Sequence, residues 1–539
     1  MSLFPTGRSS PAGPVHPAVL DRRVRELALV GLATLITLLI ALGIVVAVPH
    51  PNLFLTVAVI GGALGMVVLI LNPRIEVTVA LLALYLGLLD GPVKLGLGSG
   101  GPNEAVAVVP DVLLLAVALG AILRIMVKRD AVKLPALSVW VFAFVALVLI
   151  EAFNPKTAGI SNVLRGYRQQ LEWVPFFFFG YAIMRSRERF RKLFLILGVI
   201  TLANGVVATY QTQITPAQLA SWGPGYKTRV RGLEEEAAEG AATKRRGARV
   251  FVSEGQARVR PMALGSDFGR GGGLGVITLP GVLALLAIAS VRRRWVGILL
   301  CLGALLAIGT SLARAHVVGA VLAVLAFVAL STVAARRVTR AIAALLAVVA
   351  LAVPLGIVFV SATGSGAFSR YASLAHTDPT SNCNDCKRGT LKHIPHQIAV
   401  APFGIGLGTV AGAGFGGHVN LEEVQKISAE TEYSYLTDEL GAPGLILWTA
   451  FVLTLIGLPV FRMRRIHDPE VRLWLAALAA PLVAMLVVGT SAVVSTSTAL
   501  GPFLWFVAGT YAYWFAGSGP AHPARMGRDP APMPAVAGA

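Results

Sequence analysis

The chain has 539 residues, of which 55% are hydrophobic and 14% are charged, and its mean hydropathy is +0.73. This apolar content exceeds that of ordinary soluble domains, so the composition excludes a soluble globular protein and predicts an all-α polytopic membrane protein. The formal net charge is +19, and the positions of the basic residues decide whether it indicates nucleic-acid binding or membrane topology.

Apolar stretches long enough to cross a bilayer recur along the chain. A spanning helix needs about 20 apolar residues, and this length predicts about fourteen membrane helices, with about twelve as the lower possibility. The expected spans are residues 26–48, 52–71, 75–89, 106–127, 135–152, 170–184, 190–212, 272–290, 295–311, 313–330, 341–361, 441–461, 471–492 and 498–515. The first has no clear small-residue cleavage site after it, so we expect a retained helix rather than a cleaved signal.

Basic residues lie in every second short connection, as at 22–25, 124–133, 185–192, 292–294 and 462–465. Lysine and arginine beside a span resist translocation, so these connections are expected in the cytoplasm. Both termini then lie in the cytoplasm, as flexible tails at 1–25 and 517–539, and the protein lies in the cytoplasmic membrane. The net charge is therefore a topology signal, and we expect no nucleic-acid partner.

The same alternation places two long connections on the outer side and divides the chain into helical and loop regions. These are helices at 26–212, an outer loop at 213–270, helices at 271–361, a large outer loop at 362–440 and helices at 441–516. The first loop carries runs of both charges at 234–236 and 244–246, so it is expected to be partly disordered or locally helical. Residues 154–168 form a further outer connection, with Arg168 in it.

Five arginines are candidates on the outer face, Arg168, Arg260, Arg314, Arg370 and Arg388, and for Arg370 a solvated charge or a structural ion pair is preferred. An arginine at a span boundary needs a partner or water, and Arg314 lies on the side from which basic residues are usually excluded. Guanidinium groups suit phosphate because two parallel N–H donors match two oxygens. Together these arginines predict a site for a pyrophosphate-linked lipid. The ordinary alternative for each is a solvated charge or a structural ion pair.

Glycine alternates with apolar residues in Gly404-Ile405-Gly406-Leu407-Gly408. A glycine run without a βαβ unit around it is weak evidence for nucleotide binding, and we reject that interpretation. A tight re-entrant bend, in which the backbone closely approaches a helix or a ligand, is the preferred prediction.

Cys383 and Cys386 precede His393 and His396 in the large loop. The spacing fits no common zinc finger, and an outer location favours oxidation, so a disulfide ranks above free thiols and zinc ranks last. The histidines flank Pro395 and are expected to be exposed. We therefore predict no metal site.

The order of several motifs resembles the O-antigen ligase and polymerase superfamily, which consists of membrane glycosyltransferases of the GT-C type. The resemblance covers roughly residues 258–448. Its motifs are Thr310-Ser311 with Arg314, Arg388 ahead of an amphipathic segment, the segment 402–408, and Tyr435-Leu436 followed by Glu439-Leu440-Gly441. It implies transfer of a glycan from a polyprenyl pyrophosphate donor to a sugar hydroxyl at the outer face of the cytoplasmic membrane. No cofactor, nucleotide sugar or metal is implied.

By the same resemblance, Arg314 and Arg388 hold the lipid-linked donor. Arg260 is similar to an arginine that precedes a Gly/Pro/Asn segment, although Gly265-Ser266-Asp267 stands here where Pro-Asn is common. Ligases of this kind commonly have His-Asn where this chain has Glu432-Tyr433. A glutamate within reach of a hydroxyl can accept its proton, so Glu432 is the preferred base.

His418 and Glu430 are rivals to Glu432 as the base. The ordinary interpretation of Glu432 is a cap or an ion pair at the start of the next helix. The departure from His-Asn also leaves open whether the acceptor is that of a ligase or of a polymerase.

Two other classes remain, a transporter and a noncatalytic scaffold for envelope assembly. Ion-coupled transporters place ionisable groups at midspan, whereas Asp111 and Glu172 lie near the ends of predicted spans and the span centres are nearly free of charge. A scaffold leaves the outward arginines unexplained. A glycan transferase therefore remains the preferred function.

Overall fold

The structure is a computed structural model that describes residues 75–96, 114, 134–157, 159–231, 250–253, 256–266, 269–290, 294–334, 387–410 and 431–516. Its contacts divide the chain into two units, Met1–Thr78 with Asp111–Val132 and Val79–Pro110 with Lys133–Ala539. Nearly all described residues belong to the second unit, which is the subject below. The predicted spans at 26–48, 52–71 and 341–361, both predicted tails and all of 106–127 except Leu114 lie outside the described residues.

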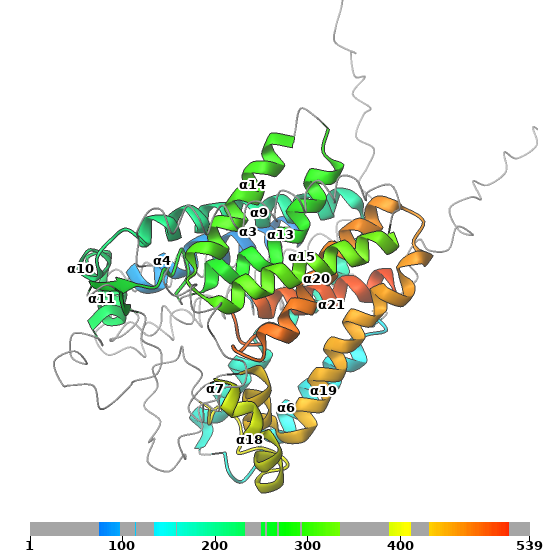
Figure 1. Cartoon of the computed structure of the whole chain (residues 1–539). Coiled ribbons are helices and arrows are strands. Elements are labelled where there is room, and N and C mark those ends of the chain that lie inside the picture. Colours follow the sequence, from blue (N-terminus) through cyan, green and yellow to red (C-terminus); the bar gives the residue numbers. More distant parts are fainter. Residues whose placement is uncertain are drawn as a thin grey trace, which may run out of the picture. The chain divides into compact units, whose positions relative to one another are not determined.

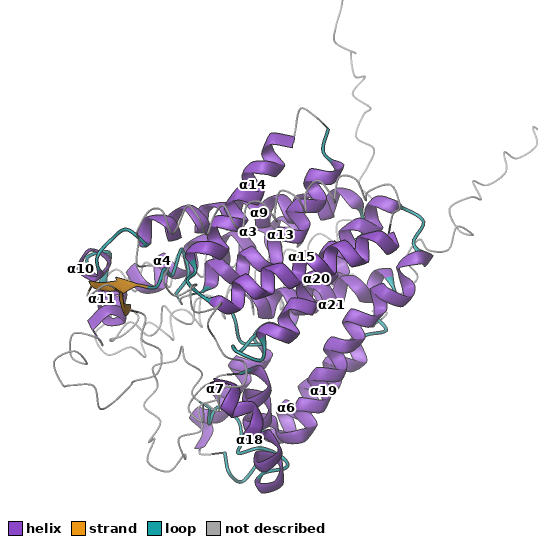
Figure 2. Ribbon diagram, in the orientation of Figure 1, coloured by secondary structure: helices purple, strands orange, loops and turns teal. Residues whose placement is uncertain are grey.

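The described part of the chain is helical except for one short hairpin (Figure 2). The helices are α3 (Ile75–Leu84), α4 (Asp90–Gly96), α6 (Ser138–Glu151), α7 (Gly159–Leu171), α8 (Pro175–Ile183), α9 (Arg187–Gln211), α10 (Pro216–Ala220), α11 (Pro224–Arg231), α13 (Arg270–Ile288), α14 (Arg294–Thr310), α15 (Arg314–Ala334), α18 (Lys387–Val400), α19 (Glu432–Arg462), α20 (Pro469–Val488) and α21 (Leu500–Trp514). A π-helical turn, η1 (Tyr85–Leu89), joins α3 to α4, and a 3-10 turn, η5 (Met463–Arg465), follows α19. Strands β1 (Val250–Ser253) and β2 (Gln256–Val259) pair antiparallel.

Six helical segments among the described residues are long and apolar enough to cross a membrane. They are Ile75–Gly96, Arg187–Gln211, Arg270–Ile288, Arg314–Thr332, Glu432–Arg465 and Pro469–Val488. Each overlaps a span predicted from hydropathy, and the shorter apolar helices Ser138–Glu151 and Arg294–Thr310 overlap two more. The prediction of a helical membrane protein thus agrees with the structure.

Helices α13 and α20 form the interior of the bundle, because most residues of their apolar windows are buried, unlike those of the other four candidate spans. Helix α15 lies along α20, and α13 packs on α9, α14, α15 and α20 (Figure 1). Glycines permit these close approaches. A side chain at Gly205 would meet the carbonyl oxygen of Gly303, and one at Gly275 would meet Ile308. Small residues have this role in packed membrane helices.

One end of the bundle, which we call the basic end, joins the starts of α9 and α20 to the end of α21. Arg191 donates from Nε and Nη2 to the two carboxylate oxygens of Glu470, at 2.8 and 2.9 Å. The indole Nε1 of Trp514 donates to the carbonyl oxygen of Met184 at 2.7 Å. The segments at 185–192 and 462–468 and the end of α21 therefore lie together.

The region from 154 to 184 differs from the prediction. Residues 154–168 were expected as a connection and 170–184 as a span, but the chain forms α7 at Gly159–Leu171 and only a nine-residue helix, α8, at Pro175–Ile183. The predicted span at 170–184 thus contains a shorter helix, and the predicted connection at 154–168 contains most of α7. Hydropathy missed α7 because its polar residues outweigh its apolar ones, although their helical spacing is regular.

The described part of the loop at 213–270 contains the local helices that its composition allowed. Helices α10 and α11 and the hairpin lie together (Figure 2), around buried Ile214, Leu219, Tyr226 and Met262, which pack on Leu95 at the end of α4. The charged runs at 234–236 and 244–246 lie outside the described residues. This loop therefore has a small core of its own.

Candidate functional site

The end of the bundle opposite the basic end joins several segments that the sequence singled out, and we call it the carboxylate end. Glu432 N donates to the carbonyl oxygen of Gly489 at 2.8 Å, which ties the start of α19 to the end of α20. A side chain at Gly272, near the start of α13, would overlap His316 and Ser311 in the turn between α14 and α15. Three helix starts, those of α13, α15 and α19, and two helix ends, those of α14 and α20, therefore lie at this end.

Glu432 is buried at this end, with 2% of its surface exposed. It is the first residue of α19, and Thr431 caps the helix by accepting from Ser434 N at 3.1 Å. The carboxylate oxygen Oε2 accepts hydrogen bonds from the backbone amides of Val494 at 2.6 Å and Ser495 at 3.1 Å. Glu432 thereby fastens the α20–α21 loop to the start of α19.

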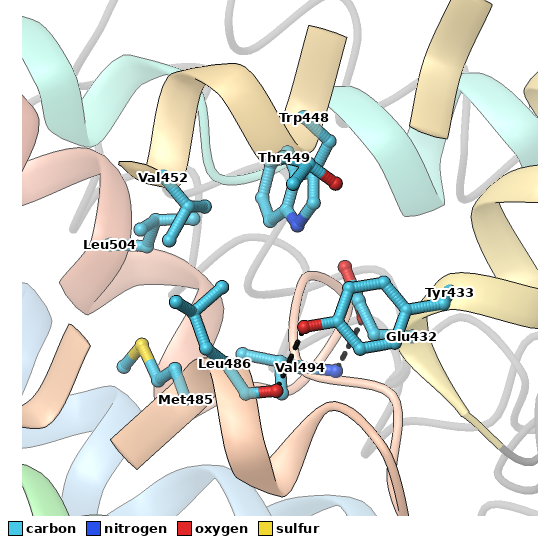
Figure 3. Close-up of a pocket in the computed structure, with 9 residues that line it drawn as sticks. All are labelled: Glu432, Tyr433, Trp448, Thr449, Val452, Met485, Leu486, Val494 and Leu504. Atoms are coloured by element: carbon cyan, nitrogen blue, oxygen red, sulfur yellow. Dashed lines mark hydrogen bonds between the residues drawn. The ribbon is translucent and has the colours of Figure 1, made fainter. Parts of the chain in front are cut away.

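The other oxygen, Oε1, is buried and has no hydrogen-bond partner among the described residues. Figure 3 shows it directed toward the side of a small pocket where Trp448 and Thr449 lie. The pocket is lined by Glu432, Tyr433, Trp448, Thr449, Val452, Met485, Leu486, Val494 and Leu504. Its volume of about 20 Å³ is room for about one water, so a sugar does not fit beside Oε1 in this arrangement.

Arg314 is the first residue of α15, and its side chain is exposed at the carboxylate end. The turn that precedes it has a positive φ of 51° at Leu312, an uncommon backbone conformation for a branched side chain. Nearby, the imidazole Nδ1 of His316 lies 3.3 Å from Ser311 Oγ. The sequence predicted the boundary position of Arg314 but not the histidine beside it.

A buried polar cluster joins α7 to α19 through Tyr435 and Glu439, in the two helical turns that follow Glu432. Gln170 Nε2 donates to Glu439 Oε2 at 2.9 Å and to the hydroxyl of Tyr435 at 3.0 Å, and that hydroxyl donates to Gln169 Oε1 at 3.4 Å. All four side chains are buried. Glu432, Tyr435 and Glu439 have the spacing i, i+3, i+7, which places them on one helix face. This spacing was the signal that could have identified Glu439 from the sequence.

The glycine run forms the bend that the sequence predicted. Gly404, Gly406 and Gly408 have φ values of +81°, +98° and +65°, a backbone region that glycine adopts readily. Ile405 N donates to the carbonyl oxygen of Asp438 at 2.7 Å. The bend therefore packs directly on the segment of α19 that carries the acidic residues.

The other side of the bend contacts the start of α7. Leu407 N donates to Thr157 Oγ1 at 3.3 Å, and a side chain at Gly408 would overlap the carbonyl oxygen of Asn162. Helix α7 also carries Arg168, which is half-buried. The bend thus holds α7 and α19 together.

Helix α18 contains Arg388 near its start and leads into the bend at Ala401. Its His393 and His396 are exposed, as expected. Arg370, His418, Glu430, Cys383 and Cys386 lie outside the described residues. Within the described ranges, no group of three His, Cys, Asp or Glu side chains could hold a metal ion.

Arg260 follows β2 and is half-buried, at the start of a segment that α9 holds in place. Gln211 Oε1 accepts from the amides of Met262 at 2.9 Å and Ala263 at 2.8 Å, and Gln211 Nε2 donates to the carbonyl oxygen of Ala263 at 3.1 Å. Asn204 Oδ1 accepts from Leu264 N at 3.1 Å. Two buried amides of one helix thus position the backbone that follows Arg260.

A buried ion pair lies toward the ends of two candidate spans, Ile75–Gly96 and Arg270–Ile288. Arg270 Nη1 lies 2.7 Å from Asp90 Oδ2, both side chains are at most 3% exposed, and Lys94 Nζ lies 2.9 Å from Asp90 Oδ1. Arg270 Nη2 also donates to the carbonyl oxygen of Leu86 in the π-helical turn. Hydropathy ended this span at residue 89, whereas the helix continues to Gly96 and includes Asp90.

The carboxylate end therefore has the buried acids of α19, the glycine bend and the exposed Arg314, and the half-buried Arg168 lies on α7, which the bend holds against α19, whereas the half-buried Arg260 lies beside the hairpin. Carboxylates accept protons and guanidinium groups bind oxyanions, so this combination suits transfer from an anionic donor. No protein-family model matches the chain, and no curated protein matches it.

Proposed function

We propose that this protein spans the cytoplasmic membrane and transfers a glycan from a polyprenyl pyrophosphate to a sugar hydroxyl at the outer face. The proposal includes about fourteen spans, cytoplasmic termini and an outward carboxylate end. It rests on the motif order that resembles O-antigen ligases and polymerases. The observation that carries it is the contacts of three segments that are far apart in sequence. The α14–α15 turn contacts the start of α13, the glycine bend contacts α19, and the start of α19 is hydrogen-bonded to the residue after α20.

The arginines would hold the donor. Arg314 and Arg388, with Arg260 and Arg168, would donate N–H groups to the pyrophosphate oxygens. As the bond between the anomeric carbon and the phosphate oxygen breaks, negative charge grows on the leaving pyrophosphate. Preorganised cations stabilise such charge more strongly in a water-poor site than in bulk water.

Glu432 would accept the proton of the acceptor. The acceptor oxygen attacks the anomeric carbon, the lipid pyrophosphate leaves with the bonding electron pair, and the hydroxyl proton passes to the carboxylate. Since Oε2 is engaged by two backbone amides, Oε1 is the oxygen that would take the proton. The pocket beside Oε1 has room for about one water, through which a base can act.

The test replaces Arg314→Ala, Arg388→Ala and Glu432→Gln one at a time in the native host, and quantifies lipid-linked and mature glycan separately. Each variant should accumulate lipid-linked glycan while mature glycan falls about 100-fold or more, the usual cost of losing one group that stabilises the transition state. Lys392→Ala, on the same helix as Arg388, is the control and should leave both pools unchanged. Normal mature glycan in all three variants, with the proteins present in the membrane, overturns the proposal.

A transporter is the second candidate, favoured by one observation. Asp90, in the candidate span Ile75–Gly96, forms a buried ion pair with Arg270, the first residue of the candidate span Arg270–Ile288, and buried ionisable groups in membrane helices commonly mark ion or substrate paths. Uptake into proteoliposomes that persists in the three variants above but is lost in folded Asp90→Asn protein would favour this candidate.

A further inference from the structure

Helix α7 has an unusual distribution of exposed and buried residues. Its apolar Ile160 and Leu164 are 73% and 60% exposed, whereas its polar Gln169 and Gln170 are 5% and 4% exposed. Residues four apart lie on one face of a helix, so the outward face is apolar and the buried face is polar. An apolar face directed away from the protein needs a nonaqueous neighbour.

Further exposed apolar side chains lie on the segments that are fastened to α7. Phe153 follows α6 and is 87% exposed, while Val400 at the end of α18 and Phe403 in the bend are each 65% exposed. Asn154 Nδ2 donates to the carbonyl oxygen of Phe403 at 3.3 Å, which joins the first of these segments to the bend. We call Phe153, Ile160, Leu164, Val400 and Phe403 the apolar rim.

The apolar rim continues the outward face of a membrane helix. In α6, a short apolar helix, Val139, Phe142 and Ile150 are exposed, as expected for side chains in contact with lipid. Phe153 lies two residues beyond the end of α6. The outward apolar surface therefore passes from α6 directly to the rim.

The charges around the rim favour anionic lipid. Residues 151–172 and 391–410 contain four bases, Lys156, Arg165, Arg168 and Lys392, against two acids, Glu151 and Glu172. Glu151 is buried and bonded to Asn154. Basic residues beside an apolar helix face attract the anionic headgroups of a membrane surface.

We propose that the apolar rim lies in the headgroup layer of the bilayer in which α19 is a candidate span and α6 packs on α19, and that α7 docks there on anionic phospholipid. Helix α7 has 13 residues, which is about 20 Å of helix and too short to span the hydrocarbon core. A short helix with one apolar face and neighbouring bases binds in the interface plane. This docking needs a membrane but no glycan, so it can be tested independently of the proposed transfer reaction.

The experiment measures membrane depth by spin labelling of the full chain in phosphatidylcholine vesicles with phosphatidylglycerol. In a background with Cys301→Ala, Cys383→Ser and Cys386→Ser, a nitroxide is placed at Ile160→Cys or Phe403→Cys. Reference labels are Leu302→Cys, exposed on the membrane helix α14, and Ala217→Cys, exposed on α10 of the loop. The ratio of oxygen to nickel-chelate accessibility reports depth.

The ratio at Ile160 and Phe403 should lie between the values at Leu302 and Ala217, and should fall in vesicles of phosphatidylcholine alone. Lys156→Glu with Lys392→Glu should remove that lipid dependence. Values equal to those at Ala217 would overturn the proposal, as would an immobile label shielded from both reagents, which indicates a covering protein. If the cysteine-free chain does not fold, a noncanonical fluorescent amino acid at position 160 or 217 of the unaltered chain, whose emission is separate from that of the eight tryptophans, gives the same comparison by brominated-lipid quenching.

Discussion

Glu432 Oε2 lies 2.6 Å from the backbone nitrogen of Val494, across 62 residues of sequence. This contact joins the start of α19 to the loop between α20 and α21, beside the pocket in Figure 3. A single carboxylate therefore has a structural partner on one oxygen and a pocket on the other. Substitutions that separate these two roles are the most informative.

Glu432→Gln and Glu432→Ala should differ in stability but not in activity. Glutamine keeps a carbonyl oxygen that can accept from the Val494 and Ser495 amides, so the folded protein should persist with no transfer activity. Alanine leaves both buried amides unpaired, at about 1–3 kcal/mol each. Thermal unfolding in detergent, alongside glycan analysis in cells, checks both expectations. An active Glu432→Gln protein would assign Glu432 a purely structural role.

Asp90→Asn should destabilise the protein more than Arg270→Gln. Removing Asp90 leaves two cations, Arg270 and Lys94, close together without their common partner, whereas removing Arg270 leaves Asp90 paired with Lys94. Breaking one partner of a buried pair costs about 3–5 kcal/mol. The measurement is the unfolding temperature of each detergent-solubilised variant.

The matched control for this pair is Arg191→Gln at the basic end. The Arg191 side chain is 44% exposed, and exposed pairs contribute about 0–1 kcal/mol, so its unfolding temperature should change little. Equal effects of Arg191→Gln and Asp90→Asn would contradict the role assigned to burial.

Gly408→Ala should destabilise the bend between α7 and α19. The φ of +65° costs an L-residue about 1–2 kcal/mol, and the added methyl would overlap the carbonyl oxygen of Asn162. Gly309→Ala is the control, because a Cβ there meets no atom within 4 Å and alanine is favoured over glycine in a helix by about 1 kcal/mol. Protein yield and unfolding temperature should fall in the first variant and hold or rise in the second.

Gln211→Leu should loosen the segment that follows Arg260. The change leaves the amides of Met262 and Ala263 and the carbonyl of Ala263 without their side-chain partner. Amide hydrogen exchange at residues 262–265 should accelerate, while exchange in α20, which does not contact Gln211, should stay slow. Unchanged exchange at these residues would show that Asn204 alone holds the segment.

Hydropathy alone predicted α9, α13, α14, α15 and α20 to within a few residues. Hydropathy failed at α7 and at the end of Ile75–Gly96 for the same reason. In both segments, buried polar side chains bond to partners that are distant in the sequence. Gln170 can be buried because it donates hydrogen bonds to Glu439 and Tyr435. Asp90 can be buried because it accepts a hydrogen bond from Arg270. A hydropathy window counts such side chains as exposed.

The sequence by itself determined that the protein is helical and membrane-embedded, because the bilayer accepts only segments whose backbone bonds are internal and whose side chains are apolar. It also located Arg314, the bend and Glu432, through residue type and local spacing. Only the tertiary structure decided which of these segments meet, and that Glu432 bonds to Val494 and Ser495. Contacts of this kind depend on the packing of helices far apart in the chain, which no local pattern encodes.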